Sequence, residues 1–142
     1  MKLLQRISIF FRRSFCLLQV YVIKKDMAYC GKNLKVFGTP RMIAPWRISL
    51  GDNVALNDGC LLNATDSSIK IGNNVVISSD AKIMAASLDT NMFFLGIRKH
   101  FDKGGIEIGD NTWICAGAIV LPGVKIVGGG NYSCWSYCCQ RC

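Results

Sequence analysis

The feature that most limits how this chain can fold is a period of six in its aliphatic residues. Ile108, Ile114, Val120 and Ile126 lie six positions apart, and mostly small or polar residues separate them. A helix needs a period of 3.6 and an ordinary strand a period of 2, so six fits neither. It fits a short strand, a corner and another short strand. Three such units make one coil of a solenoid, and we therefore expect Ile126 to stack directly over Ile108.

One short phrase recurs three times and reads as a corner of these coils. It consists of aliphatic-x-aliphatic-Gly-Asp/Asn-Asn and occupies residues 48–53, 69–74 and 106–111. Gly adopts positive φ without steric cost, and Asn and Asp tolerate it better than most residues. The period of six also continues through earlier residues, namely Leu50, Leu56, Leu62, Ile71, Ile77 and Ile83. Residues 48–126 are therefore predicted to form stacked coils of short parallel strands with the aliphatic side chains inside.

The distances between equivalent positions locate two insertions. Leu50, Ile71, Ile108 and Ile126 are separated by 21, 37 and 18 positions. If one coil takes 18 residues, the first interval carries 3 extra residues, which we place around 63–68. The second interval carries 19, which we place at 84–105. Because function tends to lie on loops held by a rigid scaffold, the longer insertion is the candidate active-site loop.

The repeated corners, together with Ile-Gly-Asp-Asn-Thr-Trp-Ile at 108–114 and Ala-Gly-Ala-Ile-Val-Leu-Pro-Gly-Val at 116–124, resemble a known family. They are similar to the hexapeptide-repeat acyltransferases, near the galactoside, maltose and polysaccharide O-acetyltransferases, over roughly residues 27–126. The resemblance implies an all-β fold, a left-handed parallel β-helix with an N-terminal helix and one inserted loop. Left-handedness comes from the resemblance alone, since parallel crossovers are otherwise nearly always right-handed.

The same resemblance implies a function. We expect transfer of an acetyl group from acetyl-coenzyme A to a sugar hydroxyl of a surface polysaccharide or lipopolysaccharide, by a cytoplasmic homotrimer without a metal. A His just after the aliphatic run of the third coil would act as general base. That position holds Leu88, and the only His of the chain is His100 in the same loop. His100 is the candidate base, with Asp89 or Asp102 orienting its ring; the alternative is a solvated Arg-Lys-His cluster at 98–100.

The resemblance also implies where donor and acceptor would bind. In the family the donor lies along the groove between two subunits, where small residues let its pantetheine arm approach the backbone. The donor site implied for this chain consists of Trp113, Cys115, Ala116 and Gly117. Small residues would also suit a tight corner without any ligand. Asn57 and Asn63 would face the acceptor sugar, although Asn is common in turns anyway.

The first 26 residues are basic and apolar and are predicted to form a helix. Arg12 and Arg13 interrupt the apolar residues, so neither half reaches the ~20 residues of a membrane-spanning helix. Two compatible interpretations remain: an amphipathic helix on the inner membrane face, and a cap over the open end of the solenoid. The net charge of +8 suits anionic lipid or a phosphate-bearing ligand. No nucleic-acid-binding motif accompanies it, so nucleic acid is not an expected partner.

Residues 127–142 depart from the pattern. Four of the eight Cys lie in the last nine positions, at Cys134, Cys138, Cys139 and Cys142. A zinc site and a disulfide cluster are two interpretations, although only one C-x-x-C pair is present and nothing indicates secretion. The third is a frameshift. Read one base later in permitted codons, residues 131–142 become Ile-Ile-Val-Ala-Gly-Ala-Ile-Val-Val-Lys-Asp-Val, a regular coil with Ala at position 134.

The frameshift hypothesis carries structural and functional consequences. It predicts that residues 131–142 are poorly ordered and do not pair with the strands around Ile114 and Val120. We therefore divide the chain into a helix at 1–26, a β-helix at 27–126 with the insertion 84–105, and an aberrant tail at 127–142. Leu88 and this tail favour an alternative function, a non-catalytic hexapeptide-repeat pseudoenzyme or scaffold. The intact run around Trp113 favours the enzyme.

Overall fold

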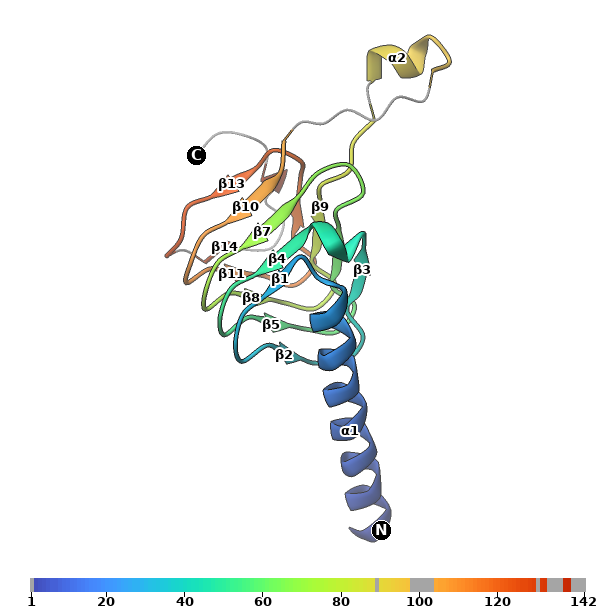
Figure 1. Cartoon of the computed structure of the whole chain (residues 1–142), viewed down its shortest axis with the longest axis vertical. Coiled ribbons are helices and arrows are strands. Elements are labelled where there is room, and N and C mark those ends of the chain that lie inside the picture. Colours follow the sequence, from blue (N-terminus) through green and yellow to red (C-terminus); the bar gives the residue numbers. More distant parts are fainter. Residues whose placement is uncertain (1, 89, 98–103, 130, 133–136, 139–142) are drawn as a thin grey trace.

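The computed structural model describes residues 2–88, 90–97, 104–129, 131–132 and 137–138, and it consists of one long helix and a parallel β-solenoid (Figure 1). The helix α1 spans Lys2–Asp26. The chain then winds through three parallel sheets, one strand of each sheet per coil. The prediction of stacked parallel strands over residues 48–126 is confirmed.

Each sheet collects equivalent strands of successive coils. The first contains β1 (Tyr29–Cys30), β4 (Ile48–Leu50), β7 (Ile69–Ile71), β10 (Ile106–Ile108) and β13 (Lys125–Ile126). The second contains β2 (Lys35–Val36), β5 (Ala55–Leu56), β8 (Val76–Ile77), β11 (Trp113–Ile114) and β14 (Asn131–Tyr132). The third contains β3 (Arg41–Ile43), β6 (Leu61–Asn63), β9 (Lys82–Met84), β12 (Ile119–Val120) and β15 (Tyr137–Cys138).

The strand register matches the predicted coil positions. Leu50 pairs with Ile71, Ile71 with Ile108, and Ile108 with Ile126. These side chains point inward with their counterparts in the other two sheets, and Leu50, like Leu62, is fully buried. Burying an aliphatic side chain of this size contributes about 1.5–3 kcal/mol. The period of six therefore specifies the core.

The recurring corner has the predicted conformation. Asn53, Asn74 and Asn111 have φ of 57°, 55° and 55°. Their side chains form a ladder in which Asn53 Nδ2 donates to Asn74 Oδ1 at 3.0 Å and Asn74 Nδ2 donates to Asn111 Oδ1 at 3.1 Å. The preceding Gly is needed for space, because a Cβ at Gly51 would lie 2.6 Å from the carbonyl carbon of Gly72. Sequence spacing and backbone chemistry agree at this corner.

All extra residues enter at the corner that leads from the third sheet to the first. In the first coil this corner holds the 3₁₀ helix η1 (Pro45–Arg47), and in the second it holds residues 64–68. In the third it holds the long insertion between Met84 and Ile106, which contains the short helix α2 (Thr90–Phe94). Figure 1 shows α2 held away from the stacked strands. The predicted insertions are therefore confirmed, and they share one edge of the solenoid.

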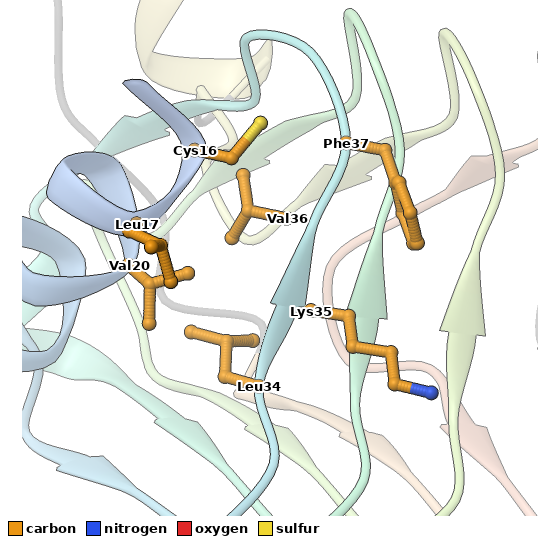
Figure 2. A pocket seen from close by; sticks show the side chains of 7 residues that line it. All are labelled: Cys16, Leu17, Val20, Leu34, Lys35, Val36 and Phe37. Atoms are coloured by element: carbon orange, nitrogen blue, oxygen red, sulfur yellow. The ribbon is translucent and has the colours of Figure 1, made fainter. Parts of the chain in front are cut away.

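The C-terminal half of α1 packs against the first coil. Cys16, Leu17 and Val20 face Leu34 and Val36 across an apolar groove of about 510 Å³ (Figure 2). The N-terminal half of the helix extends beyond the solenoid (Figure 1). The helix thus covers part of the open end, as the capping interpretation expected. Among the described residues, no helix combines the length and apolar character needed to cross a bilayer.

The prediction that residues 131–142 make no strand pairing is wrong. Asn131 and Tyr132 pair with Trp113 and Ile114 of β11, and β15 pairs with β12 in the same way. The physical reason is that the spacing of six continues: Tyr132 and Cys138 follow Ile126 at the positions that Ile and Val hold in the coil below. Backbone hydrogen bonding to an exposed strand edge does not require an aliphatic side chain.

Candidate active site

The predicted donor residues lie on the corner between the second and third sheets. This corner is a tight turn in which the N–H of Ala118 donates to the carbonyl oxygen of Cys115 at 3.2 Å. Its third residue, Gly117, has a φ of 69°, which Gly adopts without strain. Ala116 and Gly117 are exposed, and a Cβ at Gly117 would meet no atom of the described residues within 4 Å. The turn is therefore open to solvent and carries no bulky side chain.

Trp113 stands beside this turn on the outer face of β11. It pairs with Val76 of the coil below, and its indole Nε1–H donates to the hydroxyl oxygen of Ser78 at 2.8 Å. The side chain is 48% exposed. The hydrogen bond holds the ring at the edge of the sheet while leaving part of it in solvent. Cys115 next to it is half-buried and forms no disulfide with another described cysteine. The four predicted donor residues thus share one corner.

The two predicted acceptor residues lie on different corners, and their amide groups hold main chain. Asn57, two coils below Cys115, donates from Nδ2 to the carbonyl oxygen of Ile77 at 3.0 Å. Asn63 ends β6, and its Oδ1 accepts from both the N–H and the hydroxyl of Thr65 at 3.1 and 2.6 Å. These bonds are those of Asn in a turn. The structure does not bring the two side chains together.

The long insertion begins beside the corner of the coil below it. The N–H of Ser87 donates to Oδ2 of Asp66 at 2.9 Å, and the N–H of Ser67 donates to the carbonyl oxygen of Ala85 at 3.1 Å. Leu88 follows and is 43% exposed. The candidate base His100 and its candidate partners Asp89 and Asp102 lie outside the described residues. The described part of the loop therefore fixes its starting point next to Asn63.

Proteins named acetyltransferases are similar to this chain in sequence and in fold. No protein-family model matches the chain. A protein of Escherichia coli K12, provisionally named colanic acid biosynthesis acetyltransferase WcaF, is 28% identical over 110 residues, 76% of this chain and 57% of the relative. The crystal structure of a maltose O-acetyltransferase from Clostridium difficile 630 is 28% identical, covers 73% of this chain and 55% of its own, and superposes with a TM-score of 0.63.

A third comparison adds a bound donor. A hexapeptide-repeat acetyltransferase from Vibrio cholerae, solved with acetyl-coenzyme A, superposes with a TM-score of 0.69 at 20% identity, covering 85% of this chain and 66% of its own. These similar proteins are named acetyltransferases, and the structural neighbour from Vibrio cholerae is a hexapeptide-repeat protein. The fold of this chain is the left-handed parallel β-helix of these neighbours. The chain matches 57% of the length of its Escherichia coli relative.

Two ionisable groups, Asp58 and Cys60, lie two coils below the donor corner on the same side of the solenoid. The N–H of Thr39 donates to Asp58 at 2.7 Å, and this bond, with that of the Thr39 hydroxyl, lowers the pKa of Asp58. Burial raises the pKa of Cys60 to about 11, so its thiol stays protonated at neutral pH. In the described part of the chain no His, Cys, Asp and Glu side chains gather into a group that could hold a metal ion.

The sequence did not reveal two side chains that position the candidate site. Ser78 holds Trp113, and Asp66 anchors the long loop at Ser87. Each partner lies one coil away, offset by 35 and 21 positions. A short polar residue near a corner has many possible partners in the sequence. Only its distance along the chain from the equivalent position of the next coil could have suggested these two.

Proposed function

We propose that this chain is an acetyl-coenzyme A-dependent O-acetyltransferase that modifies a sugar hydroxyl of a surface polysaccharide or lipopolysaccharide and works as a homotrimer. The observation that carries the proposal is the open turn beside Trp113, in a chain whose similar proteins are named acetyltransferases. The name of the Escherichia coli relative refers to colanic acid, and that of the Clostridium difficile structure to maltose. Both names support a sugar as acceptor.

The donor side of the proposal rests on the shape of the corner. A pantetheine arm is narrow and carries amide groups, so it fits against exposed backbone that lacks large side chains. Ala116 and Gly117 supply such a surface, and the half-exposed indole of Trp113 supplies an apolar wall beside it. The bond from Trp113 to Ser78 keeps the wall in place without ligand. A preorganised site of this kind loses little conformational entropy on binding.

The acceptor side rests on the long insertion. We assign His100 as general base, with Asp89 as the group that orients its ring. In the reaction the sugar oxygen attacks the thioester carbonyl carbon, the C–O bond forms, and the C–S bond breaks. The hydroxyl proton passes to the imidazole and then to the departing thiolate of coenzyme A. Imidazole suits this task because its ordinary pKa lies near neutral pH. Asn57 and Asn63, which lie on two separate corners, are assigned to acceptor contacts from the family resemblance alone.

The donor site is tested by filling the open corner. Ala116→Phe places a bulky side chain on the turn, and we expect acetyl-coenzyme A to bind about tenfold more weakly or worse in isothermal titration calorimetry. Lys32→Phe is the matched control, since Lys32 is exposed in the first coil, at the corner between the first and second sheets. Equal loss of affinity in both variants, or none in either, would remove the assignment of this corner.

The base is tested by two substitutions in the insertion. His100→Ala should lower the rate of acetyl transfer to sugar acceptors by ~10²–10⁴ while leaving acetyl-coenzyme A affinity nearly unchanged, because general-base catalysis typically contributes that much. Full activity of His100→Ala would show that the base lies elsewhere. Leu88→His supplies an imidazole at the position the family resemblance indicates, and a rise in activity would mark Leu88 as the site where catalysis was lost.

A second candidate is a non-catalytic hexapeptide-repeat pseudoenzyme or scaffold. The observation that favours it is the exposed Leu88 where a base is expected. The two candidates differ in one measurement, the release of coenzyme A thiol. A scaffold releases none with any sugar, whether or not it binds acetyl-coenzyme A. The enzyme releases thiol in proportion to acetylated sugar. We place the enzyme in the cytoplasm, because that compartment holds its donor.

A further inference from the structure

Helix α1 presents two different faces to its surroundings. Val20 and Ile23 pack against the core of the first coil. Phe15, Leu18, Tyr21 and Val22 are large, apolar and exposed, with 52%, 60%, 67% and 48% of their surface in solvent. At 3.6 residues per turn these four lie on one side of the helix, opposite Val20. We call them the apolar stripe.

The apolar stripe is more than a scatter of exposed side chains. Phe15, Leu18 and Tyr21 stand three apart and Val22 stands four after Leu18, the spacings at which side chains are neighbours on a helix surface. Single exposed apolar residues are ordinary on protein surfaces, whereas contiguous ones mark sites of interaction. The solenoid does not cover the stripe, because it meets the helix on the opposite face. An apolar partner from outside the chain is therefore indicated.

The charge of the helix selects the partner. Its 25 residues contain Lys2, Arg6, Arg12, Arg13, Lys24 and Lys25, with Asp26 as the only acidic residue. Lys24 and Lys25 are exposed in the last turn, directly after the apolar stripe. A second α1 would bring the same excess of positive charge, with only its own Asp26 to balance it. A surface that is both apolar and anionic balances it, and a bilayer with anionic headgroups is such a surface.

We propose that α1 binds an anionic lipid surface through the apolar stripe. The helix lies in the headgroup region with Phe15, Leu18, Tyr21 and Val22 toward the acyl chains, and Lys24 and Lys25 contact lipid phosphates. Because the N-terminal half of α1 extends beyond the solenoid, the helix can lie along the bilayer without displacing the coils (Figure 1). This binding requires neither acetyl transfer nor an acceptor, so it stands or falls separately from the proposed function.

The test is sedimentation of the full chain with vesicles. We expect the chain to sediment with vesicles of phosphatidylglycerol and phosphatidylcholine, and at least tenfold less strongly with phosphatidylcholine alone. Leu18→Gln with Val22→Gln removes half of the stripe and should weaken binding at least tenfold. Lys24→Glu with Lys25→Glu should weaken it roughly tenfold or more, since each basic residue near an anionic surface contributes measurably. Circular dichroism checks that the variants remain helical.

Phe94→Gln is the matched control, because Phe94 is 86% exposed on α2, away from α1. It should bind vesicles like the unaltered chain. Loss of binding in Phe94→Gln but not in the α1 variants would overturn the proposal in favour of the loop. Absence of vesicle binding, together with a fall in oligomer mass of Leu18→Gln/Val22→Gln by light scattering, would overturn it in favour of a second copy. Equal binding to neutral vesicles would overturn the role of charge.

Discussion

Single residues at the corners join one coil to the next through hydrogen bonds that strand pairing does not supply. The carboxylate of Asp58 accepts from the N–H of Thr39 in the coil below, and that of Asp66 accepts from Ser87 in the coil above. Trp113 reaches Ser78 in the same manner. Each bond lies at the edge of the solenoid, where side chains from different coils meet. Two of these bonds, those of Trp113 and Ser87, belong to the candidate site.

The carboxylate of Asp58 makes stability depend on pH. Because the N–H of Thr39 donates to it, the folded-state pKa of Asp58 is lower than its ordinary value of 3.8. The stabilisation is therefore present above pH 3.8 and is lost as pH falls through the folded-state pKa. Asp58→Asn should reduce the drop in unfolding free energy between pH 5 and pH 3, measured by urea titration at both values. An unchanged drop would show that Asp58 is not linked to folding.

At the scale of the element, the corner between the first and second sheets needs both a glycine and a ladder of asparagines. The coils stack so closely there that glycine is followed one coil later by glycine, as Gly31, Gly51, Gly72 and Gly109 show. At the equivalent position of the last such corner Val127 is tolerated and is 80% exposed. Most of its side chain therefore meets solvent. The need for glycine thus arises from the following coil.

Gly51→Ala tests this requirement. The added Cβ would lie 2.6 Å from the backbone carbonyl of Gly72, which belongs to a paired strand end and cannot move without disturbing its coil. Overpacking of this kind typically costs about 1–3 kcal/mol of unfolding free energy, measured by urea denaturation. Val127→Ala is the control at the equivalent corner position and should change stability by less than about 0.5 kcal/mol. Equal effects of the two substitutions would contradict the argument.

For the whole molecule, stability depends on how well each coil covers the one below. Interior positions six apart are filled by aliphatic side chains from Leu50 to Ile126, and this column is fully or nearly fully buried. The strands β14 and β15 continue the stack with Tyr132 and Cys138 at the corresponding positions. The pairing shows that this segment can follow the solenoid register. It leaves the frameshift as a hypothesis about the gene.

Replacing residues 131–142 by Ile-Ile-Val-Ala-Gly-Ala-Ile-Val-Val-Lys-Asp-Val tests that hypothesis at the protein level. The change puts Ile at position 132 and Val at position 138, which pair with Ile114 and Val120. We expect a higher unfolding free energy, because each added buried aliphatic contributes about 1.5–3 kcal/mol. A tail of Gly and Ser of equal length is the control and should be less stable. The coding DNA should show a one-base change between codons 126 and 131.

Tight zinc binding by the unaltered tail, lost when Cys139 and Cys142 become Ser, would instead support the metal interpretation. If the replaced tail gave no gain in stability, the aliphatic residues would not enter the core. That result would also argue against the frameshift hypothesis. Either result would leave the lower coils unaffected, since their strands pair with one another.

What the sequence by itself determined is the path of the backbone. A period of six and a corner of glycine and asparagine act locally, and they were enough to predict the coils, the inward residues and the two insertions. What only the tertiary structure decided are the contacts between residues far apart in the chain: Trp113 with Ser78, Ser87 with Asp66, the outward stripe of α1 and the pairing of β14. These depend on which side chains meet across coils of unequal length. Local chemistry sets the turn of the backbone, but only stacking sets the neighbours.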